Sequence, residues 1–418
     1  MVMSCMDVSR DGSRGAQDAV AGPTNPVLLW ATHALEALQA DGSVSPTVAT
    51  RMMAMESIAV LDVVNAVQHA PGFLASGAAP SGMSEAAAIA ASAAYVLEHA
   101  MPGQKALIEH DLQLSLAGVP DGKAQDAGVA FGRAVAAAVV EARADDGWDA
   151  MATVSAGDGE PGTWRPTLPN YAAPVTPQWG DVAPFMMKAG DAFRPDGPPA
   201  LDSAEYAAAL NEVKELGGAH STLRTADQTE LARFWANDAG AYTAPGHLDH
   251  IAIDIAQEQG LTSAQSAQLL AELNVAMADA AIAAWDAKGA YEFWRPIDAI
   301  RLADTDGNPA TSADPTWTPL LPTPSHPEYP SGHAVFAGAW STVMTRYFGD
   351  MAFDATSADA PGVVRHFDSF AQAALEDAES RIFGGVHFQF SAQDGLATGE
   401  AVAADVLAIF QKDGLLAA

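Results

Sequence analysis

The segment AAAIAASAAYVLE, residues 86–98, decides the fold class of this chain. Alanine and leucine are strong helix formers, and neither glycine nor proline interrupts the run. The segment RMMAMESIAVLDVVNA, residues 51–66, has the same texture, and Leu28, Leu29 and Leu35 also recur at helical spacing. These patterns predict four or five helices between residues 26 and 144.

The residue composition changes twice after this helical region. Residues 145–202 are rich in glycine and proline and carry scattered aromatics such as Trp164 and Trp179, which predicts a long ordered loop. Helical patterns return from residue 203, and strand patterns are nearly absent. We therefore expect one all-α domain over residues 25–418, built as two four-helix-bundle-like halves (25–144 and 203–418) joined by the loop 145–202. Residues 1–24 are predicted to be a disordered tail.

Composition excludes several classes of function. Hydrophobic residues make up 49% of the 418 residues, enough for a large core. The net charge of -32 repels nucleic acid and anionic membrane surfaces, so we expect neither as a partner. No run of strongly apolar residues is long enough to predict a membrane span. The first 20 residues lack the apolar centre of a secretory signal, so localisation stays open between a cytoplasmic protein and a secreted or periplasmic one that has lost its signal.

Basic residues, scarce elsewhere, gather in three segments of the C-terminal half. The first is WDAKGAYEFWRP, residues 285–296. Lys288 and Arg295 are seven residues apart, or two helical turns, so we expect both on one face of a helix that ends at Arg295 before Pro296. Two cations on one face could hold a single anion. Taken alone, however, this segment is more typical of a solvated or salt-bridged helix face.

The second segment is PSHPEYPSGH, residues 324–333, followed by an apolar run to residue 348. A Pro-Ser-Gly turn that opens a long helix places backbone N–H groups and the positive end of the helix dipole at one point, which favours anion binding. Ser331 can cap the helix or donate a hydrogen bond, Gly332 lets an anion approach the backbone, and His333 stands beside them.

The third segment is SRIFGGVHF, residues 380–388. Arg381 and His387 would point about 240° apart on a straight helix. The Gly384–Gly385 pair offers the break that could turn both toward one target. Together the three segments supply three cations, a hydroxyl, a backbone anion site and two histidines, which predicts a site for a tetrahedral or trigonal-bipyramidal oxyanion.

The pattern Lys-x6-Arg-Pro, Pro-Ser-Gly-His and Ser-Arg-x5-His resembles that of the vanadium-dependent haloperoxidases, which share their site with acid and lipid phosphatases. Residues 224–235 and the aromatic loop resemble the bacterial haloperoxidase branch. The resemblance implies one vanadate per chain as cofactor, with hydrogen peroxide, a halide and a small organic acceptor as reaction partners. It also allows a homodimer.

The resemblance further implies a role for each matching residue. His387 would bond the metal, and His333 would be the acid–base that, with Lys288 and His387, carries the catalysis. The halide side of the pocket would be lined by Trp285 and His326, and a histidine at this last position implies a preference for bromide over chloride. The oxygens of vanadate would be held by Lys288, Arg295, Ser331, Gly332 and Arg381.

The chain departs from the family at one position. The family often has an acid four residues after the metal-binding histidine, and this chain has Ser391 there. We expect Asp394 or a backbone carbonyl to hold His387 instead. Two other interpretations stay open: an acid phosphatase that acts through a phospho-histidine at His387, and a member whose site has lost its catalytic activity.

Two further patterns resemble metal sites only weakly. The glycine of residues 304–308, DTDGN, is misplaced for a calcium loop, and His247 and His250 lack further zinc ligands at a recognisable spacing. We predict a turn and a helix start at these places.

Overall fold

The computed structural model describes residues 25–152, 157–237, 240–412 and 414. Within these residues the protein has thirteen α-helices and a single two-stranded hairpin, which confirms the all-α prediction. The predicted tail, residues 1–24, lies outside the described part of the chain. The helices are α1 (Pro26–Asp41), α2 (Pro46–Gln68), α3 (Glu85–Ala100), α4 (Lys105–Ala117), α5 (Lys123–Ala142), α6 (Ala204–Leu216), α7 (Ala226–Phe234), α8 (Ala244–Glu258), α9 (Ser263–Tyr291), α10 (Pro296–Arg301), α11 (Gly332–Phe348), α12 (Phe370–Phe383) and α13 (Gln389–Lys412).

Most helices begin at a side chain that caps the backbone. Asn25 and Ser45 accept hydrogen bonds from the first turns of α1 and α2, and a proline follows each of them at the first helical position. Thr225 and Thr262 form complete capping boxes with Gln228 and Gln265. Such caps satisfy N–H groups that have no partner inside the helix, so the sequence itself marks where these helices start.

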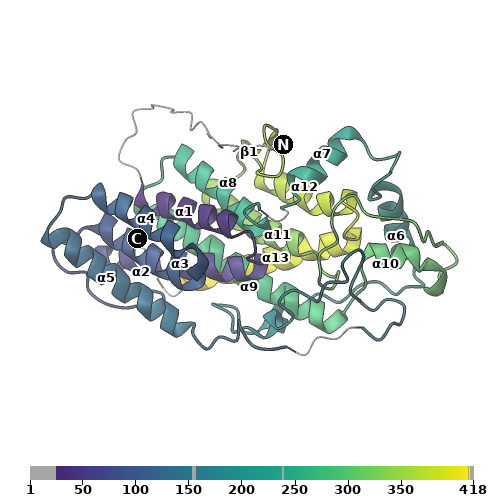
Figure 1. The fold of residues 1–418 in the computed structure, drawn as a ribbon, viewed down its shortest axis with the longest axis horizontal. Helices are drawn as coiled ribbons and strands as arrows, with labels where there is room; N and C mark the ends of the chain where they lie inside the picture. Colours follow the sequence, from purple (N-terminus) through teal and green to yellow (C-terminus); the bar gives the residue numbers. More distant parts are fainter. Residues whose placement is uncertain (1–24, 153–156, 238–239, 413, 415–418) are drawn as a thin grey trace, which may run out of the picture.

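The helices form two groups that share the long helix α9 (Figure 1). Helices α1 to α5 lie at one end of the molecule and α6, α7, α10 and α12 at the other, while α9, α11 and α13 run between them. Helix α9 packs against α2 on one side and against α11 and α13 on the other. Helix α8, although it follows the loop, packs on α1 and α2 as well as on α11. One hydrophobic core therefore extends from the N-terminal helices through α9, α11 and α13 to α12, and a second core contains the buried faces of α6 and α10.

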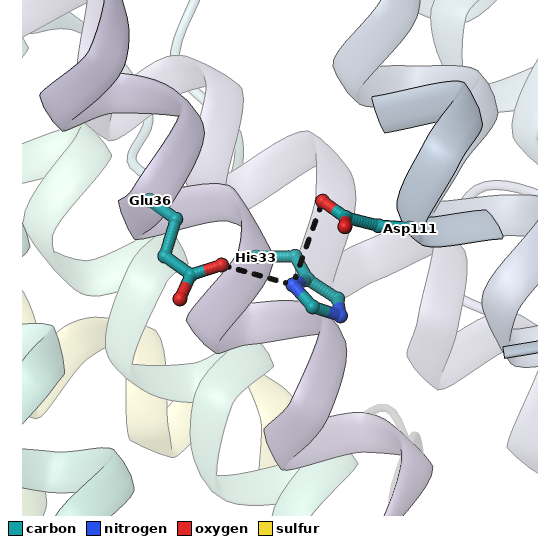
Figure 2. Close-up of side chains that lie close together, drawn as sticks. All are labelled: His33, Glu36 and Asp111. Atoms are coloured by element: carbon teal, nitrogen blue, oxygen red, sulfur yellow. Dashed lines mark hydrogen bonds and ion pairs between the residues drawn. The ribbon is translucent and has the colours of Figure 1, made fainter. Parts of the chain in front are cut away.

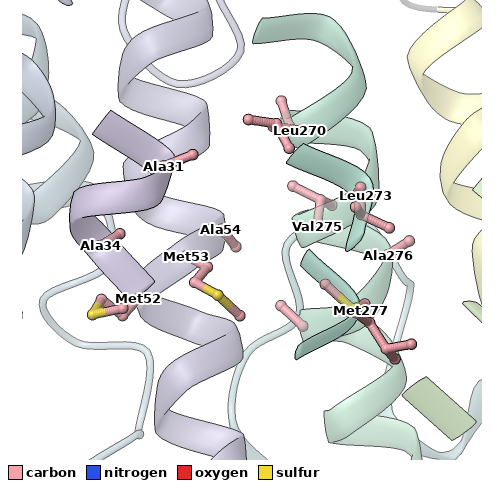
Figure 3. Packing of buried hydrophobic residues seen from close by; sticks show 14 of the residues in the cluster. Ala31, Ala34, Met52, Met53, Ala54, Leu270, Leu273, Val275, Ala276 and Met277 are labelled. Carbon is pink, nitrogen blue, oxygen red and sulfur yellow. The ribbon is translucent and has the colours of Figure 1, made fainter. Parts of the chain in front are cut away.

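Small and flexible side chains let α9 approach the N-terminal helices closely. Ala31 of α1, with Met53 and Ala54 of α2, faces Leu273 and its neighbours on α9 (Figure 3). Among the described helices, α9 alone is long and apolar enough to cross a membrane by length and composition, yet 94% of its apolar window is buried inside the protein. The apolar residues of α9 therefore pack in the core of the protein.

The hairpin was not predicted from the sequence. Strands β1 (Phe353–Thr356) and β2 (Val364–Phe367) pair antiparallel with Phe353 opposite Phe367. Each strand has only four residues, and β1 alternates buried and exposed residues whereas β2 does not, so the pair carries only a weak strand pattern.

The loop 145–202 is packed onto the end of α9 over its described residues. Trp164 and Trp179 are buried, and the Trp164 N–H donates to the carbonyl of Glu292 at 2.6 Å. A side chain at Gly180 would come within 2.6 Å of the Asp286 Cα, so only glycine allows this approach. The loop thereby covers the turn of α9 that carries Lys288.

Candidate active site

Lys288 lies in the last turn of α9 and is 1% exposed. Its ammonium donates hydrogen bonds to the carbonyls of Pro327, Glu328 and Pro330, at 2.8, 3.0 and 2.5 Å. The first predicted segment therefore contacts the second through this side chain. Burial lowers the pKa of Lys288, and the nearby Arg295 lowers it further while Glu328 opposes the shift.

The structure corrects the prediction that Lys288 and Arg295 share a helix face. Helix α9 ends at Tyr291, and Glu292 takes a left-handed conformation with φ 41°. Arg295 is extended (φ -78°, ψ 153°) and precedes α10, whose first residue is Pro296. The residue before a proline avoids helical geometry, as expected, but the helix stops earlier than predicted. The two cations approach one another through this turn.

Arg295 is fully buried and connects the second and third segments. Its guanidinium donates to the carbonyls of His326 and Val386, each at 2.8 Å. The same group lies 3.1 Å from Nε2 of His387 and 2.9 Å from Nδ1 of His326. A guanidinium has no acceptor, so the His387 Nε2 must accept this hydrogen bond and carries no proton.

The Ser-Gly-His turn opens α11 as the sequence predicts. Ser331 is the N-cap, and its hydroxyl accepts from the Ala334 N–H while its own N–H donates to the carbonyl of Ser391. A side chain at Gly332 would meet the Trp285 ring at 3.6 Å, so this glycine faces the predicted halide pocket. His333 follows in the first turn. Its Nε2 is buried and has no hydrogen-bond partner among the described residues.

The glycine pair turns His387 back toward Arg381, as expected. Helix α12 ends at Phe383, Gly385 has φ 78°, and the His387 N–H donates to the carbonyl of Arg381. A side chain at Gly385 would come within 2.3 Å of the Gly217 carbonyl oxygen, so only glycine fits. Arg381 is 2% exposed and donates to the carbonyl of Trp235.

The residue that holds His387 is Glu328, and the expectation of Asp394 or a backbone carbonyl is wrong. The His387 Nδ1–H donates to Glu328 Oε1 at 2.8 Å, and both side chains are buried. Asp394 instead accepts from the hydroxyl of Tyr329. Sequence reasoning missed Glu328 because it searched along the helix that follows His387, whereas Glu328 belongs to the second segment.

The electrostatics of the site favour neutral histidines beside charged arginines. Burial lowers the pKa of His387 well below its usual value, and Arg295, Lys288 and Arg381 lower it further. The pKa of His333 is also lowered, by burial and then by Arg381, although the backbone of Trp235 and Ala236 opposes this shift. At neutral pH each ring therefore offers a lone pair.

The predicted halide side of the pocket opens into a cavity of about 230 Å³. The His326 and Trp285 rings lie 5.0 Å apart between centroids, and the Lys288 ammonium lies 5.7 Å from the Trp285 ring. Nδ1 of His326 lies between the Arg295 guanidinium and the Pro327 carbonyl at 3.1 Å. Residues of the loop and of the α9 terminus complete the lining: Trp164, Pro174, Val175, Pro177, Gly289 and Glu292.

The structure thus brings the predicted site residues into one buried region. One contact network around Glu328 joins Lys288, Arg295, His326 and His387. The start of α11, with Ser331 and Gly332, lies beside this network. Arg381 and His333 lie against the backbone of Trp235, and Arg381 perturbs the pKa of both Arg295 and His387. The chemistry of this donor set suits an anion with several oxygens.

A second group of histidine and carboxylates lies in the N-terminal half (Figure 2). Nδ1 of His33 is 3.1 Å from Glu36 on the same helix and 3.7 Å from Asp111 on α4. The Glu36 side chain is 54% exposed, so water screens its ion pair with His33. His247, in contrast, lies near the start of α8, as predicted, and contacts the carbonyl of Thr356 at 2.8 Å. Neither histidine is part of the candidate site.

Comparison with known proteins shows which class of protein this helical fold and its buried cluster of cations and histidines resemble. Residues 268–413 match the family model of the VCPO second helical-bundle domain. The crystal structure of a bacterial vanadium-dependent iodoperoxidase superposes with a TM-score of 0.83 and 28% identity, over 93% of this chain and 97% of that one. By sequence in its second helical bundle and by fold over most of its length, the chain is thus similar to the vanadium haloperoxidases.

Two chloroperoxidases are also similar. The vanadium chloroperoxidase of Curvularia inaequalis is 33% identical over 253 residues, an alignment that covers 46% of this chain and only 41% of that protein's own length. The apo form of a bacterial vanadium-dependent chloroperoxidase shares the fold, with a TM-score of 0.72 and 20% identity over 88% of this chain.

Proposed function

We propose that this protein is a vanadate-dependent haloperoxidase that uses hydrogen peroxide to oxidise a halide, bromide more readily than chloride, for the halogenation of a small organic acceptor. The observation that carries the proposal is the state of His387. Its Nε2 is unprotonated and accepts a hydrogen bond inside a cluster of buried cations. A neutral imidazole beside a concentration of positive charge is suited to bond the metal of an oxyanion such as vanadate.

The residues present fit this cofactor. Lys288, Arg295 and Arg381 would neutralise the oxygens of vanadate, helped by the Ser331 hydroxyl and the Gly332 N–H, while His387 would bond the metal. The partnerless Nε2 of His333 meets a second requirement, because a proton must move to and from an oxygen of the reacting group. Vanadate supplies a Lewis acid that polarises peroxide for attack by the halide.

Four residues would set the conditions around the reacting atoms. His333 takes up and returns protons, and its lowered pKa keeps the ring ready as a base. Lys288 places a positive charge where electron density shifts toward oxygen. His326 and Trp285 line the cavity through which halide and acceptor would enter.

The experiment is a pair of assays on one preparation. The first follows bromination of monochlorodimedone with vanadate, peroxide and bromide, and the second follows hydrolysis of p-nitrophenyl phosphate. We expect vanadate-dependent bromination, its loss in His387→Ala, and its retention in His99→Ala, which alters an exposed histidine of α3. Phosphate-ester hydrolysis alone would instead support the phosphatase that acts through His387, and inactivity in both assays would support a site without catalytic activity.

A further inference from the structure

Glu328 is the point where all three segments of the site meet. Its N–H donates to the carbonyl of Phe293, and its own carbonyl accepts from Lys288. Its carboxylate accepts from the His387 Nδ1 at 2.8 Å and from the Phe388 N–H at 3.0 Å. The residue is 0% exposed. Both of these hydrogen bonds go to Oε1, whereas Oε2 is buried with no hydrogen-bond partner among the described residues, so the carboxylate is fixed in position through one oxygen.

We propose that Glu328 is the positioning residue of His387: it fixes the ring with Nε2 toward the cation cluster and does so in place of the acid that family members often carry at the position of Ser391. This inference rests on the proposed function. The Ser391 hydroxyl lies 3.5 Å from the same Nδ1, at the limit of a hydrogen bond, so it is a weak partner at best. Glu328 reaches that nitrogen from a different segment of the chain.

The geometry explains what the contact does for the ring. Nδ1 donates to a carboxylate and Nε2 accepts from a guanidinium, so the two partners demand the same tautomer. The Glu328–His387–Arg295 chain therefore orients the ring, fixes its proton on Nδ1 and makes Nε2 more basic. Without Glu328, the ring would be free to turn or to change tautomer, and Nε2 would no longer point toward the vanadate site.

In this chain the carboxylate that supports the histidine comes from a different segment than in many family members. An acid four residues after the histidine would lie in the first turn of α13, which begins two residues after His387. Glu328 lies on the turn that also carries Ser331 and Gly332, so in this chain the oxyanion-binding turn and the histidine support are one element. A shift of this turn would move both the anion donors and the histidine.

The test combines loss and rescue of the carboxylate. Vanadate affinity would be measured by titration calorimetry for the wild type, Glu328→Gln, Glu328→Ala, Ser391→Asp and the double variant Glu328→Ala/Ser391→Asp. We expect Glu328→Ala to weaken binding about 10- to 100-fold and Glu328→Gln, which keeps an acceptor, to weaken it less. Ser391→Asp should restore much of the affinity in the double variant. Glu272→Gln, a buried acid of α9 away from the site, serves as the control.

A second measurement separates this proposal from the proposed function. The nitrogen chemical shifts of His387 report which ring nitrogen carries the proton, with or without vanadate. We expect the proton on Nδ1 in the wild type and in the double variant, and a mixture of tautomers in Glu328→Ala. If the wild type binds no vanadate, the function fails while the nitrogen shifts still test Glu328. Wild-type affinity in Glu328→Ala, an unchanged tautomer, or no rescue by Ser391→Asp would each overturn the positioning role.

Discussion

Two buried polar regions of this molecule differ in whether their side chains can become neutral by keeping or losing a proton. Where α2, α8 and α9 meet, the acids Glu56 and Asp249 are 3% and 2% exposed. Asn274 donates to Asp249 and to Ser57, which in turn contacts Glu56. Burial raises the pKa of Glu56 to about 8, with Asp249 adding to the shift, and raises that of Asp249 to about 7. These acids can avoid a buried charge by keeping a proton.

The active-site region buries charge that cannot be removed in this way. Arg295 and Arg381 are 0% and 2% exposed, and although burial lowers the pKa of Arg295 to about 9, its guanidinium stays protonated at neutral pH. Of the nearby acids, Glu328 is engaged by His387, and burial raises the pKa of Asp377 to about 8 although Arg381 opposes this. The first region can serve the fold alone, whereas the second retains positive charge that an anionic ligand would balance.

The largest effect is expected from His333→Ala, which removes a proton carrier while leaving the cations in place. Peroxidase turnover should fall about 100- to 10,000-fold, the usual contribution of a general acid–base. Vanadate affinity should remain measurable, because Lys288, Arg295, Arg381 and His387 still hold the anion. The check is steady-state kinetics beside a vanadate titration. Turnover near the wild-type level with an unchanged pH profile would show that His333 moves no proton in the reaction.

A smaller effect, on stability, should come from the protonated acids of the other region. The folded pKa values of Glu56 and Asp249 lie above their ordinary values of 4.5 and 3.8. Their contribution to stability is therefore fully present below about pH 4 and is lost as pH rises toward about 8. Since each unit of pKa difference corresponds to about 1.4 kcal/mol, the loss for Glu56 is on the order of a few kcal/mol.

This prediction is checked by chemical denaturation between pH 5 and about pH 8.5. Glu56→Gln should flatten the fall in the free energy of unfolding across this range, because the variant has no proton to lose there. The matched control is Glu400→Gln, which alters an exposed acid of α13 and should keep the wild-type slope. Equal slopes for both variants would mean that Glu56 is ionised in the folded protein.

The smallest effect concerns His326, at the border of the charged region. Replacing its imidazole with phenyl removes a polar contact with Arg295 and makes that side of the cavity drier. Chloride is the harder halide to oxidise and needs a more strongly activated peroxide, so His326→Phe should lower the bromide-to-chloride ratio of rates, by roughly 3- to 10-fold. Halogenation assays with each halide provide the measurement. His220→Phe, at an exposed histidine, is the control, and an unchanged ratio in His326→Phe would remove this residue from halide selection.

The sequence predicted the parts of this protein that local chemistry determines. Helical composition, capping residues and the Gly384–Gly385 break all act within a few residues, and the helices and the turn at His387 follow from them. The start of α11 at Gly332, after the cap Ser331, is also a local event. The three segments could be grouped because each contains basic residues in a chain with a net charge of -32.

The remaining features depend on contacts between distant segments. Pro296 excludes a helical Arg295, but the earlier end of α9 goes with the contacts of Glu292, whose carbonyl accepts from Trp164 of the loop. The carboxylate that supports His387 comes from 59 residues earlier in the chain, so no spacing rule around the histidine could reveal it. Glu328 would have been found only by asking which buried acid could balance the cations.

The most direct test of the account is the number of vanadium atoms that each chain binds. Equilibrium dialysis of the wild type against vanadate, followed by metal analysis, should give one vanadium per chain, and His387→Ala should bind none under the same conditions. The buried cations remain in that variant, so the difference isolates the bond to the histidine from the attraction of the positive charge. A wild type without saturable binding, or a His387→Ala variant that binds vanadate equally well, would contradict the proposal that this cluster is a vanadate site with His387 as its ligand.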